Sequence, residues 1–261
     1  MSAALVTGDD LVGWLLAAGV RRDDVLLAHC SLSAFGTVVG GEQTVIAALR
    51  EVVGSAGTIV MPAQSWQLCD PDYLDDPALD AAQRELVRRA LPAFDPRLTP
   101  TRTMGVVAEL FRTLPGVRRS PHPHRSFSAW GASADAITLA QPLDAPFGEE
   151  SPLAALYARD AKVVLLGVGY ESCTALHLAE MRSGRALART VPNGAPVRVT
   201  GERTWVTWDE PVLEDADFPA LGAAFERAAG VLPARVGGAE CRVVSMVALV
   251  DFALQAMNED S

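Results

Sequence analysis

Residues 162–180, KVVLLGVGYESCTALHLAE, contain the succession of features that decides the fold of this chain. The run over 162–169 is apolar almost throughout, which is typical of a strand covered on both faces. Gly167 and Gly169 then predict a turn, and the segment that starts at Thr174 has the pattern of a helix. A buried strand, a glycine turn and a helix in this order predict one unit of an α/β layered fold.

The rest of the chain repeats this alternation of strands and helices. Helices are predicted over 11–18, 42–53, 104–114, 151–160, 174–187 and 218–230, and strands over 25–29 and 57–62. The segment 196–208 alternates as a hairpin does, and 241–257 has the pattern of a strand followed by a helix with Ser245 as its cap. The Asp- and Pro-rich stretch 69–100 surrounds one predicted helix, 80–91. We therefore expect one domain over 1–261 with an inserted excursion near 69–100.

Composition limits the class of protein. The 261 residues are 49% hydrophobic and 21% charged, as in a soluble globular protein. The four cysteines are far apart and form no CxxC pair, which argues against a structural zinc site or a disulfide framework. The apolar stretch 11–20 follows two aspartates and no basic residues, unlike a signal peptide, and no run reaches the roughly 18 apolar residues of a membrane span. We expect a cytoplasmic protein that does not bind membranes.

The charge of −10, from 22 basic and 32 acidic residues, argues against a nucleic-acid partner. The windows 70–80 and 209–217 each hold five acidic residues and no basic one. They are either solvated loops and helix starts or an acidic wall that attracts a polycation. The segment 111–126 holds four arginines and two histidines without an acid, which suits phosphate groups or a solvated basic loop equally well.

The helix predicted after Gly169 carries a candidate for acid-base chemistry. His177 and Glu180 are three residues apart and therefore share a helix face, and Thr174 lies three residues before His177. A carboxylate beside an imidazole fixes the tautomer of the ring, as a general base requires. Such a pair is also common as a surface ion pair, but this helix begins beyond the end of a buried strand, where α/β folds place their sites. His29 ends another predicted strand.

Other reaction classes have weaker signals. A dinucleotide fingerprint fails because Ser172 stands where the third glycine belongs, and GxSxG and Walker A motifs are absent. Cys173 and His177 are four apart and could form a nucleophile-base couple, although Cys173 fits a packing position better. The four histidines include no HExxH motif, so we expect no metal.

Four sequence blocks, at 29–62, 94–126, 147–169 and 174–180, together resemble the successive signature blocks of the aminoglycoside 3-N-acetyltransferase, or antibiotic N-acetyltransferase, family. The resemblance spans roughly residues 10–255. It implies a layered α/β/α fold of the antibiotic N-acetyltransferase type, distinct from the GNAT acetyltransferases. It also implies transfer of acetyl from acetyl-coenzyme A, a co-substrate, to the 3-amino group of 2-deoxystreptamine aminoglycosides, which gives aminoglycoside resistance.

The resemblance assigns roles to particular residues. His177 corresponds to the general base, with Glu180 and Thr174 orienting it, and His29 is a further catalytic candidate, as a second acid/base or a positioner of the acetyl group. The residues expected to bind coenzyme A are Ser31, Leu32, Phe35, Gly36, Thr58, Pro62, Arg118, Arg119, His122, Ser126 and Ser151. Candidates for contact with the polycationic aminoglycoside are Asp70, Asp72, Thr174, Glu214, Asp215 and Asp217. The expected assembly is a monomer or a homodimer.

Three other functions stay open on the sequence alone. A relative of the same fold could acetylate a different amine in a biosynthetic pathway. A non-catalytic protein could bind polyamines or coenzyme A, although the presence of both His177 and Glu180 argues against it. A metal-dependent hydrolase is the third.

Overall fold

The computed structural model describes residues 5–259. Its helices are α1 (Gly8–Ala17), α2 (Gly41–Val53), α3 (Pro71–Leu74), α4 (Ala81–Ala90), α5 (Gly105–Thr113), α6 (Ala134–Thr138), α7 (Pro152–Tyr157), α8 (Leu176–Arg182), α9 (Phe218–Ala229) and α10 (Met246–Glu259). Its strands are β1 (Leu5–Val6), β2 (Val25–Cys30), β3 (Thr37–Val38), β4 (Thr58–Pro62), β5 (Arg118–Arg119), β6 (Phe127–Gly131), β7 (Lys162–Leu166), β8 (Thr190–Val199), β9 (Glu202–Pro211), β10 (Ala234–Val236) and β11 (Ala239–Ser245). Short 3-10 turns lie at Leu32–Phe35, Trp66–Leu68, Tyr170–Ser172 and Ala186–Ala188.

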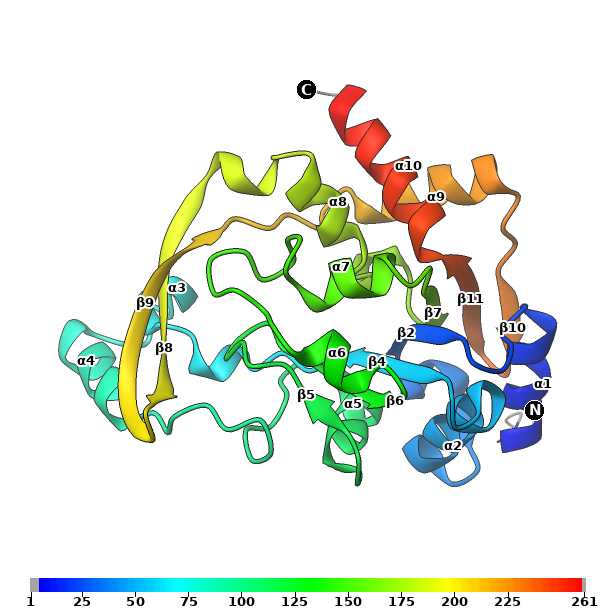
Figure 1. The fold of residues 1–261 in the computed structure, drawn as a ribbon, viewed down its shortest axis with the longest axis horizontal. Coiled ribbons are helices and arrows are strands. Elements are labelled where there is room, and N and C mark those ends of the chain that lie inside the picture. Colours follow the sequence, from blue (N-terminus) through cyan, green and yellow to red (C-terminus); the bar gives the residue numbers. More distant parts are fainter. Residues whose placement is uncertain (1–4, 260–261) are drawn as a thin grey trace.

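A seven-stranded sheet in the order β10-β11-β7-β2-β4-β6-β5 forms the centre of the molecule (Figure 1). Strands β7, β2 and β4 are parallel, and antiparallel strands extend the sheet on both sides. The register pairs Cys30 with Leu166 and Leu27 with Val60, so the carboxyl ends of the three parallel strands lie at one edge of the sheet. Loops that leave these strands therefore meet at that edge.

Alternate residues of the central strands enter two separate hydrophobic clusters. Leu27, Val163 and Leu165 pack in the cluster that contains residues of α6 to α10, whereas Leu26, Val164 and Leu166 pack in the cluster formed with α1, α2 and α5. Figure 1 shows α7 to α10 on one side of the sheet and α1, α2 and α5 on the other. The apolar run over 162–166 is thus explained by burial on both faces, and the α/β expectation is confirmed.

Most predicted elements are present with shifted ends. The helix predicted over 174–187 is shorter, because a 3-10 turn precedes α8 and Gly184 has a positive φ of 80° just after it. The strand predicted over 162–169 ends at Leu166, since Gly167 turns the chain at φ 68°. Ser151 and Ser245 accept bonds from the backbone N–H groups of Ala154 and Ala248, as expected of caps.

The sequence analysis missed several short elements. Strands β5, β6 and β10 and helices α3 and α6 were not predicted, and all of them are short. Such segments carry too few residues for a periodic pattern, and their pairing partners are distant in the sequence. Within residues 5–259, no helix has the length and apolar character that a membrane crossing needs.

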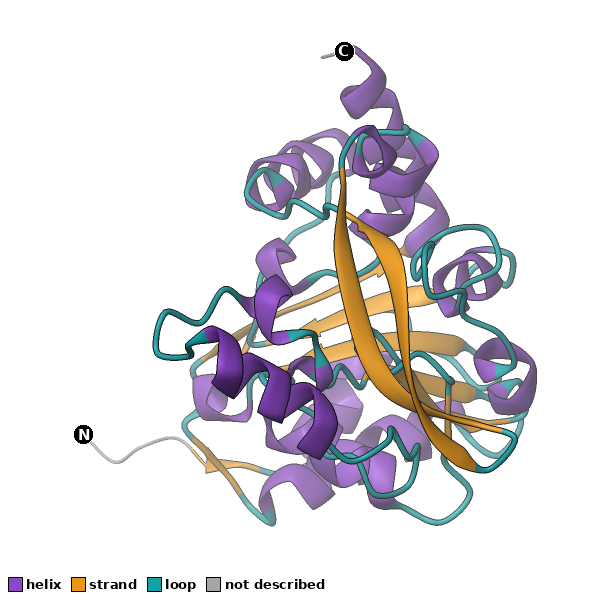
Figure 2. Cartoon of the chain, turned by 90° about the vertical axis from the view of Figure 1, so that its left-hand side faces the viewer, coloured by secondary structure: helices purple, strands orange, loops and turns teal. Residues whose placement is uncertain are grey.

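The predicted hairpin is a long arm formed by β8 and β9, which pair from Thr190–Pro211 to Val199–Glu202. It runs beside α3 and α4 at one end of the molecule (Figures 1 and 2). The excursion contacts this arm: Phe94 N–H donates to Pro196 O, and Arg203 donates to Leu91 O at 2.8 Å. The segment 69–100 is therefore packed against the hairpin.

Gly131 offers a test of the sheet. It pairs with Thr58 at φ 114°, and a Cβ there would lie 2.0 Å from Gly57 O. We expect Gly131→Ala to lower the free energy of unfolding by about 3 kcal/mol or more, because both the backbone conformation and the close approach oppose a side chain. Urea unfolding measures the change. Gly13→Ala is the control, since a methyl group in the middle of α1 meets no atom within 4 Å and should raise stability by about 0.5–1 kcal/mol. Equal stability of the two variants would contradict the prediction.

Candidate active site

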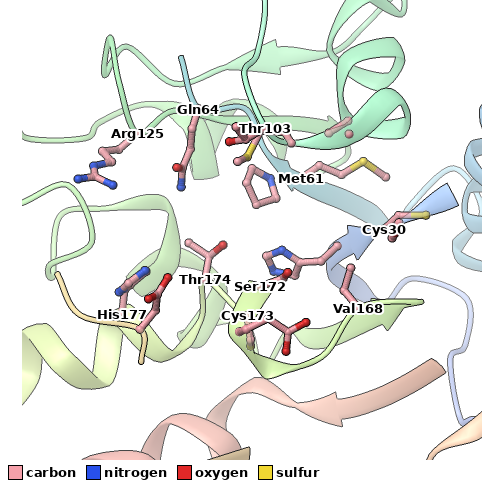
Figure 3. Close-up of a pocket in the computed structure, with 18 of the residues that line it drawn as sticks. Cys30, Met61, Gln64, Thr103, Arg125, Val168, Ser172, Cys173, Thr174 and His177 are labelled. Carbon is pink, nitrogen blue, oxygen red and sulfur yellow. The ribbon is translucent and has the colours of Figure 1, made fainter. Parts of the chain in front are cut away.

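A cavity of about 510 Å³ lies at the carboxyl ends of the three parallel strands. Residues from β2 and β4, the turn between β7 and α8, the loops that leave β4, and the β9–α9 connection line it. They include Ala28, His29, Cys30, Ser31, Met61, Pro62, Gln64, Trp66, Tyr73, Thr103, Met104, Gly105, Arg125, Val168, Glu171, Ser172, Cys173, Thr174, His177, Leu213, Asp215 and Phe218. Figure 3 shows part of this lining. The position agrees with the expectation that the site lies where the parallel strands end.

His177 projects into the cavity from the first turn of α8 (Figure 3). Its ring stacks on Phe147, with centroids 5.0 Å apart and planes within 5°, and Phe218 covers it at 4.9 Å. Nδ1 lies 2.8 Å from Glu180 Oε2. Because a carboxylate accepts hydrogen bonds, we assign Nδ1 as the donor in this contact, which leaves Nε2 as the ring nitrogen that can accept a proton.

Glu180 is almost completely buried, and both of its oxygens have donors. Oε2 accepts from His177, and Oε1 accepts from the backbone N–H of Glu214 at 2.7 Å. From the sequence, the side chain of Glu214 is a candidate for contact with the aminoglycoside. In the structure its backbone fixes Glu180, while its carboxylate is exposed and lies 3.2 Å from Arg189.

His29 lies at the end of β2 and lines the same cavity. Burial, and then the nearby charge of His177, lowers its pKa to about 3. Its ring is therefore neutral at ordinary pH, and Nε2 is buried without a partner in the described chain. A buried nitrogen without a hydrogen bond on a cavity wall is suited to bind a polar atom of a ligand.

Cys173 and Cys30 also line the cavity. Burial raises the pKa of each thiol to about 12, so both remain protonated at neutral pH. Because the thiolate is the reactive form, neither is an activated nucleophile. All four cysteines are free. Among residues 5–259 no group of three or more His, Cys, Asp or Glu side chains is arranged to hold a metal ion.

The residues expected to bind coenzyme A are divided by the structure. Ser31 and Pro62 line the cavity. Phe35 is buried in the hydrophobic cluster formed with α1, α2 and α5, and Leu32 packs against this cluster. Gly36 ends the 3-10 turn at φ 85°. Thr58 lies at the opposite end of β4 from Pro62, and its Oγ1 accepts from Ser133 N–H at 3.0 Å.

Side chains of the basic block 111–126 form hydrogen bonds to other groups of the protein. Arg119 donates to Thr99 O, Ala63 O and Ser65 Oγ. His122 Nδ1 accepts from the backbone N–H groups of His124 and Arg125.

Three further residues of the coenzyme A set lie outside the cavity lining as well. Ser126 donates to Ala63 O, and Ser151 caps α7. Arg118 is exposed and pairs with Asp135 at 2.6 Å. The block is thus largely a structural network.

The acidic candidates differ in the same way. Thr174 and Asp215 line the cavity. Asp70 and Asp72 are paired with Arg88, and Asp217 with Arg185 at 2.6 Å. The two acidic windows of the sequence therefore do not form one wall.

Several polar residues outside the predicted site set line the cavity, among them Glu171, Gln64 and Arg125. Glu171 stands on the 3-10 turn before α8, and Gln64 follows β4. Arg125 is buried, with its guanidinium 4.0 Å from the ring centroid of Trp66. Glu171 could have been found from its place directly after the β7 turn, whereas Gln64 and Arg125 lie in segments whose folding depends on contacts distant in the sequence.

The fold and this site define an α/β protein with a carboxylate-oriented imidazole facing a cavity of a size that suits small molecules. The sequence model of the aminoglycoside 3-N-acetyltransferase family matches residues 27–258. The chain belongs to this family of acyltransferases.

Individual relatives agree with that assignment. The chain is 41% identical to the aminoglycoside N(3')-acetyltransferase-like protein YokD of Bacillus subtilis over 95% of this chain and 91% of that protein. It is 37% identical to aminoglycoside N(3)-acetyltransferase VII of Streptomyces paromomycinus, over 97% and 92%. Its structure matches the crystal structure of YokD with a TM-score of 0.92, at 39% identity over 98% of this chain and 95% of that one.

Two solved structures with ligands are also similar. The complex of AAC-IIIb with CoASH has a TM-score of 0.85, at 30% identity over 98% of both chains. AAC-VIa bound to sisomicin has a TM-score of 0.84, at 28% identity over 98% of this chain and 99% of that one.

The buried histidines predict how stability depends on pH. Burial lowers the pKa of His29 and of His122 to about 3, below the ordinary value of about 6.5, so the unfolded chain binds protons that the folded chain excludes. The contribution of these two histidines to the free energy of unfolding is therefore fully present above pH 6.5, and it is lost as the pH is lowered. Each histidine should cost about 2 kcal/mol between pH 7.5 and 5.0, measured by urea unfolding.

Two controls accompany that measurement. Glu109 and Glu210 have pKa values of about 2, so their contributions are lost only as the pH falls below about 4.5 and do not enter this range. His29→Asn should reduce the slope of stability against pH by about half, because one of the two neutral histidines is removed. A free energy of unfolding that stays constant from pH 7.5 to 5.0 would contradict the assignment of both rings as neutral.

Proposed function

We propose that this protein transfers the acetyl group of acetyl-coenzyme A to the 3-amino group of 2-deoxystreptamine aminoglycosides, that His177 is the general base, and that aminoglycoside resistance is the consequence in the cell. The observation that carries the proposal is the bond between His177 Nδ1 and buried Glu180, which leaves Nε2 as the basic nitrogen of a ring that lines the cavity. Family membership supplies the reaction class, and the complex of AAC-IIIb with CoASH supports the co-substrate.

The reaction forms a C–N bond and breaks a C–S bond in a ternary complex. The acceptor amine gives a proton to His177 Nε2 and attacks the thioester carbonyl, and coenzyme A leaves as the thiolate, which then takes up a proton. In this scheme Glu180 stabilises the imidazolium while it exists, because the carboxylate contacts Nδ1 and is held in place by the backbone N–H of Glu214. General-base assistance of this kind contributes about 10²–10⁴ in rate.

Neutral His29 positions the acetyl group in this scheme. With the proton on Nε2, the ring donates a hydrogen bond to the thioester oxygen, on which negative charge develops during attack. The low pKa of about 3 excludes the imidazolium as a general acid at neutral pH. Ser31 and Pro62, which lie at the ends of β2 and β4, would line the path of the pantetheine arm.

Two carboxylates favour a polycationic acceptor. Glu171 and Asp215 line the cavity and are exposed, and neither has an arginine or lysine partner within the described residues. The other acidic candidates, Asp70, Asp72, Glu214 and Asp217, form ion pairs with arginines. Ammonium groups of an aminoglycoside would pair with these two carboxylates and bring the polyamine to His177. A structural relative, AAC-VIa, has been solved bound to sisomicin, which supports an acceptor of this kind.

The first test is release of free thiol from acetyl-coenzyme A with gentamicin, apramycin and a non-aminoglycoside polyamine as acceptors. We expect release with an aminoglycoside and a fall of about 10²–10⁴ in kcat for His177→Ala, because the base is lost. Coenzyme A binding, followed by thermal shift, should persist in the variant. Release only with an amine of another class would instead favour the biosynthetic relative.

Glu180→Gln tests the orienting carboxylate separately. The amide can still accept from His177 but carries no charge, so we expect kcat to fall by about tenfold or more with little change in the KM for acetyl-coenzyme A. Glu149→Gln is the matched control. Glu149 is an exposed carboxylate that pairs at 2.7 Å with Arg182, a residue of the same helix α8 that carries Glu180. Equal activity of the two variants would rule out a role for the Glu180 charge.

The variant His29→Ala tests the proposed hydrogen-bond donor to the thioester oxygen. We expect His29→Ala to lower kcat, because the donor to the thioester oxygen is removed. Full activity in this variant would remove His29 from the catalytic scheme without affecting the role of His177.

A further inference from the structure

A buried ion pair between two distant segments holds Arg125 at the cavity. Arg125 Nε donates to Glu210 Oε1 at 2.7 Å, and Nη2 donates to Tyr73 OH at 2.9 Å. The face of the guanidinium rests on the ring of Trp66. Four contacts from three other residues therefore fix the orientation of this side chain.

Glu210 is fully buried behind Arg125 and is ionised. Burial opposes its charge, but hydrogen bonding from His124 and the charge of Arg125 together hold its pKa at about 2. Asn193 Nδ2 also donates to Oε2 at 2.6 Å. The pair is therefore nearly neutral overall, with its negative end in the protein interior and its positive end at the cavity.

One nitrogen of the guanidinium is not used by the protein. No described residue accepts a hydrogen bond from Arg125 Nη1, and Arg125 lines the cavity. The side-chain amide of Gln64, on the same cavity lining, likewise has no hydrogen bond within residues 5–259; only the backbone carbonyl of Gln64 accepts one, from Arg102 N–H at 2.8 Å. In Figure 3 these two side chains enter the cavity from one side, and Thr174 and His177 enter from the other.

The cavity is therefore lined by negative charge from one set of segments and by positive charge from another. Two carboxylates without cationic partners, Glu171 and Asp215, come from the segments before α8 and α9. Arg125 presents fixed N–H donors from the segment before β6. An ammonium group beside Arg125 would meet the positive end of the pair, whereas a hydroxyl or ether oxygen there would accept its hydrogen bonds.

We propose that Arg125, with Gln64, is a specificity-determining residue that binds an uncharged oxygen of the acceptor and disfavours an ammonium group at that position. The inference rests on the proposed function and adds to it the part of the acceptor that must not be charged. The site then selects among aminoglycosides by where each carries a hydroxyl in place of an amine.

Two pairs of probes test the inference. Neomycin and paromomycin differ by an amine or a hydroxyl on one sugar ring, and so do kanamycin B and kanamycin A. We expect the hydroxyl member of at least one pair to bind about tenfold more tightly, measured by calorimetry with coenzyme A present, and to show the higher kcat/KM. Equal affinities, or tighter binding of the amine member, in both pairs would overturn the proposal.

The double variant R125Q/E210Q removes both charges together, because a single change would leave a buried charge unpaired. We expect the preference to fall below about threefold in this variant. The matched control is R242Q/E226Q, which removes a partly buried pair outside the cavity lining and should keep the preference. A preference that survives in R125Q/E210Q would also overturn the proposal. If that variant does not fold, the comparison in the natural protein and the variant Gln64→Leu still decide the outcome.

The two proposals fail in different ways. Absence of thiol release with every aminoglycoside would contradict the proposed function, and the calorimetric comparison would still test Arg125. Acetylation of both members of each pair with equal kcat/KM would contradict the role of Arg125 alone.

Discussion

The buried pair between Arg125 and Glu210 is the constraint on which the geometry of the site depends. It joins the segment before β6 to the end of β9, residues that are 85 positions apart in the chain. The chain then continues from β9 into the segment that carries Leu213, Asp215 and Phe218 to the cavity. Breaking such a pair from one side would leave a buried charge without a partner, which typically costs about 3–5 kcal/mol.

This connection reaches His177 through two contacts. The segment after β9 provides the backbone N–H of Glu214, which binds Glu180, and Phe218, which covers the imidazole. Phe147, from the loop before α7, stacks on the same ring. The tautomer and the orientation of His177 are therefore set by groups from three separate parts of the chain, although the His177–Glu180 pair itself lies within one helical turn.

The sequence could predict what depends on local pattern. The alternation of helices and strands, the caps at Ser151 and Ser245, and the shared face of His177 and Glu180 all follow from spacings of a few residues. Even the position of His29 at a strand end is a local property. These features survive in the structure because tertiary packing agrees with the local preference.

What the sequence could not predict depends on contacts between distant residues. The arginines and histidines of 111–126 are indistinguishable, by composition, from a free phosphate-binding loop, but His122 and Arg119 fold inward and bind backbone atoms. The acidic windows 70–80 and 209–217 likewise give no sign in the sequence of which carboxylates are paired or buried. In the structure, Arg84 and Arg88 pair with Asp70 and Asp72 of one window, whereas in the other window Glu210 is buried and Asp215 is exposed at the cavity. Charge patterns give the number of charges, and only the fold decides which of them remain available.

In the proposed reaction, one small cavity must both bind a cationic acceptor and hold an unprotonated base. Glu180 contacts Nδ1 of His177, and the buried, neutral ring of His29 adds no charge to the same cavity wall. The positive end of the Arg125–Glu210 pair opposes accumulation of further cations on the other side. In the proposed scheme Glu171 and Asp215 attract the acceptor and Arg125 restricts its position, so affinity and orientation arise from different residues. Under that scheme, a change at Arg125 would alter the orientation of the amine toward His177 and preserve the attraction for a polyamine.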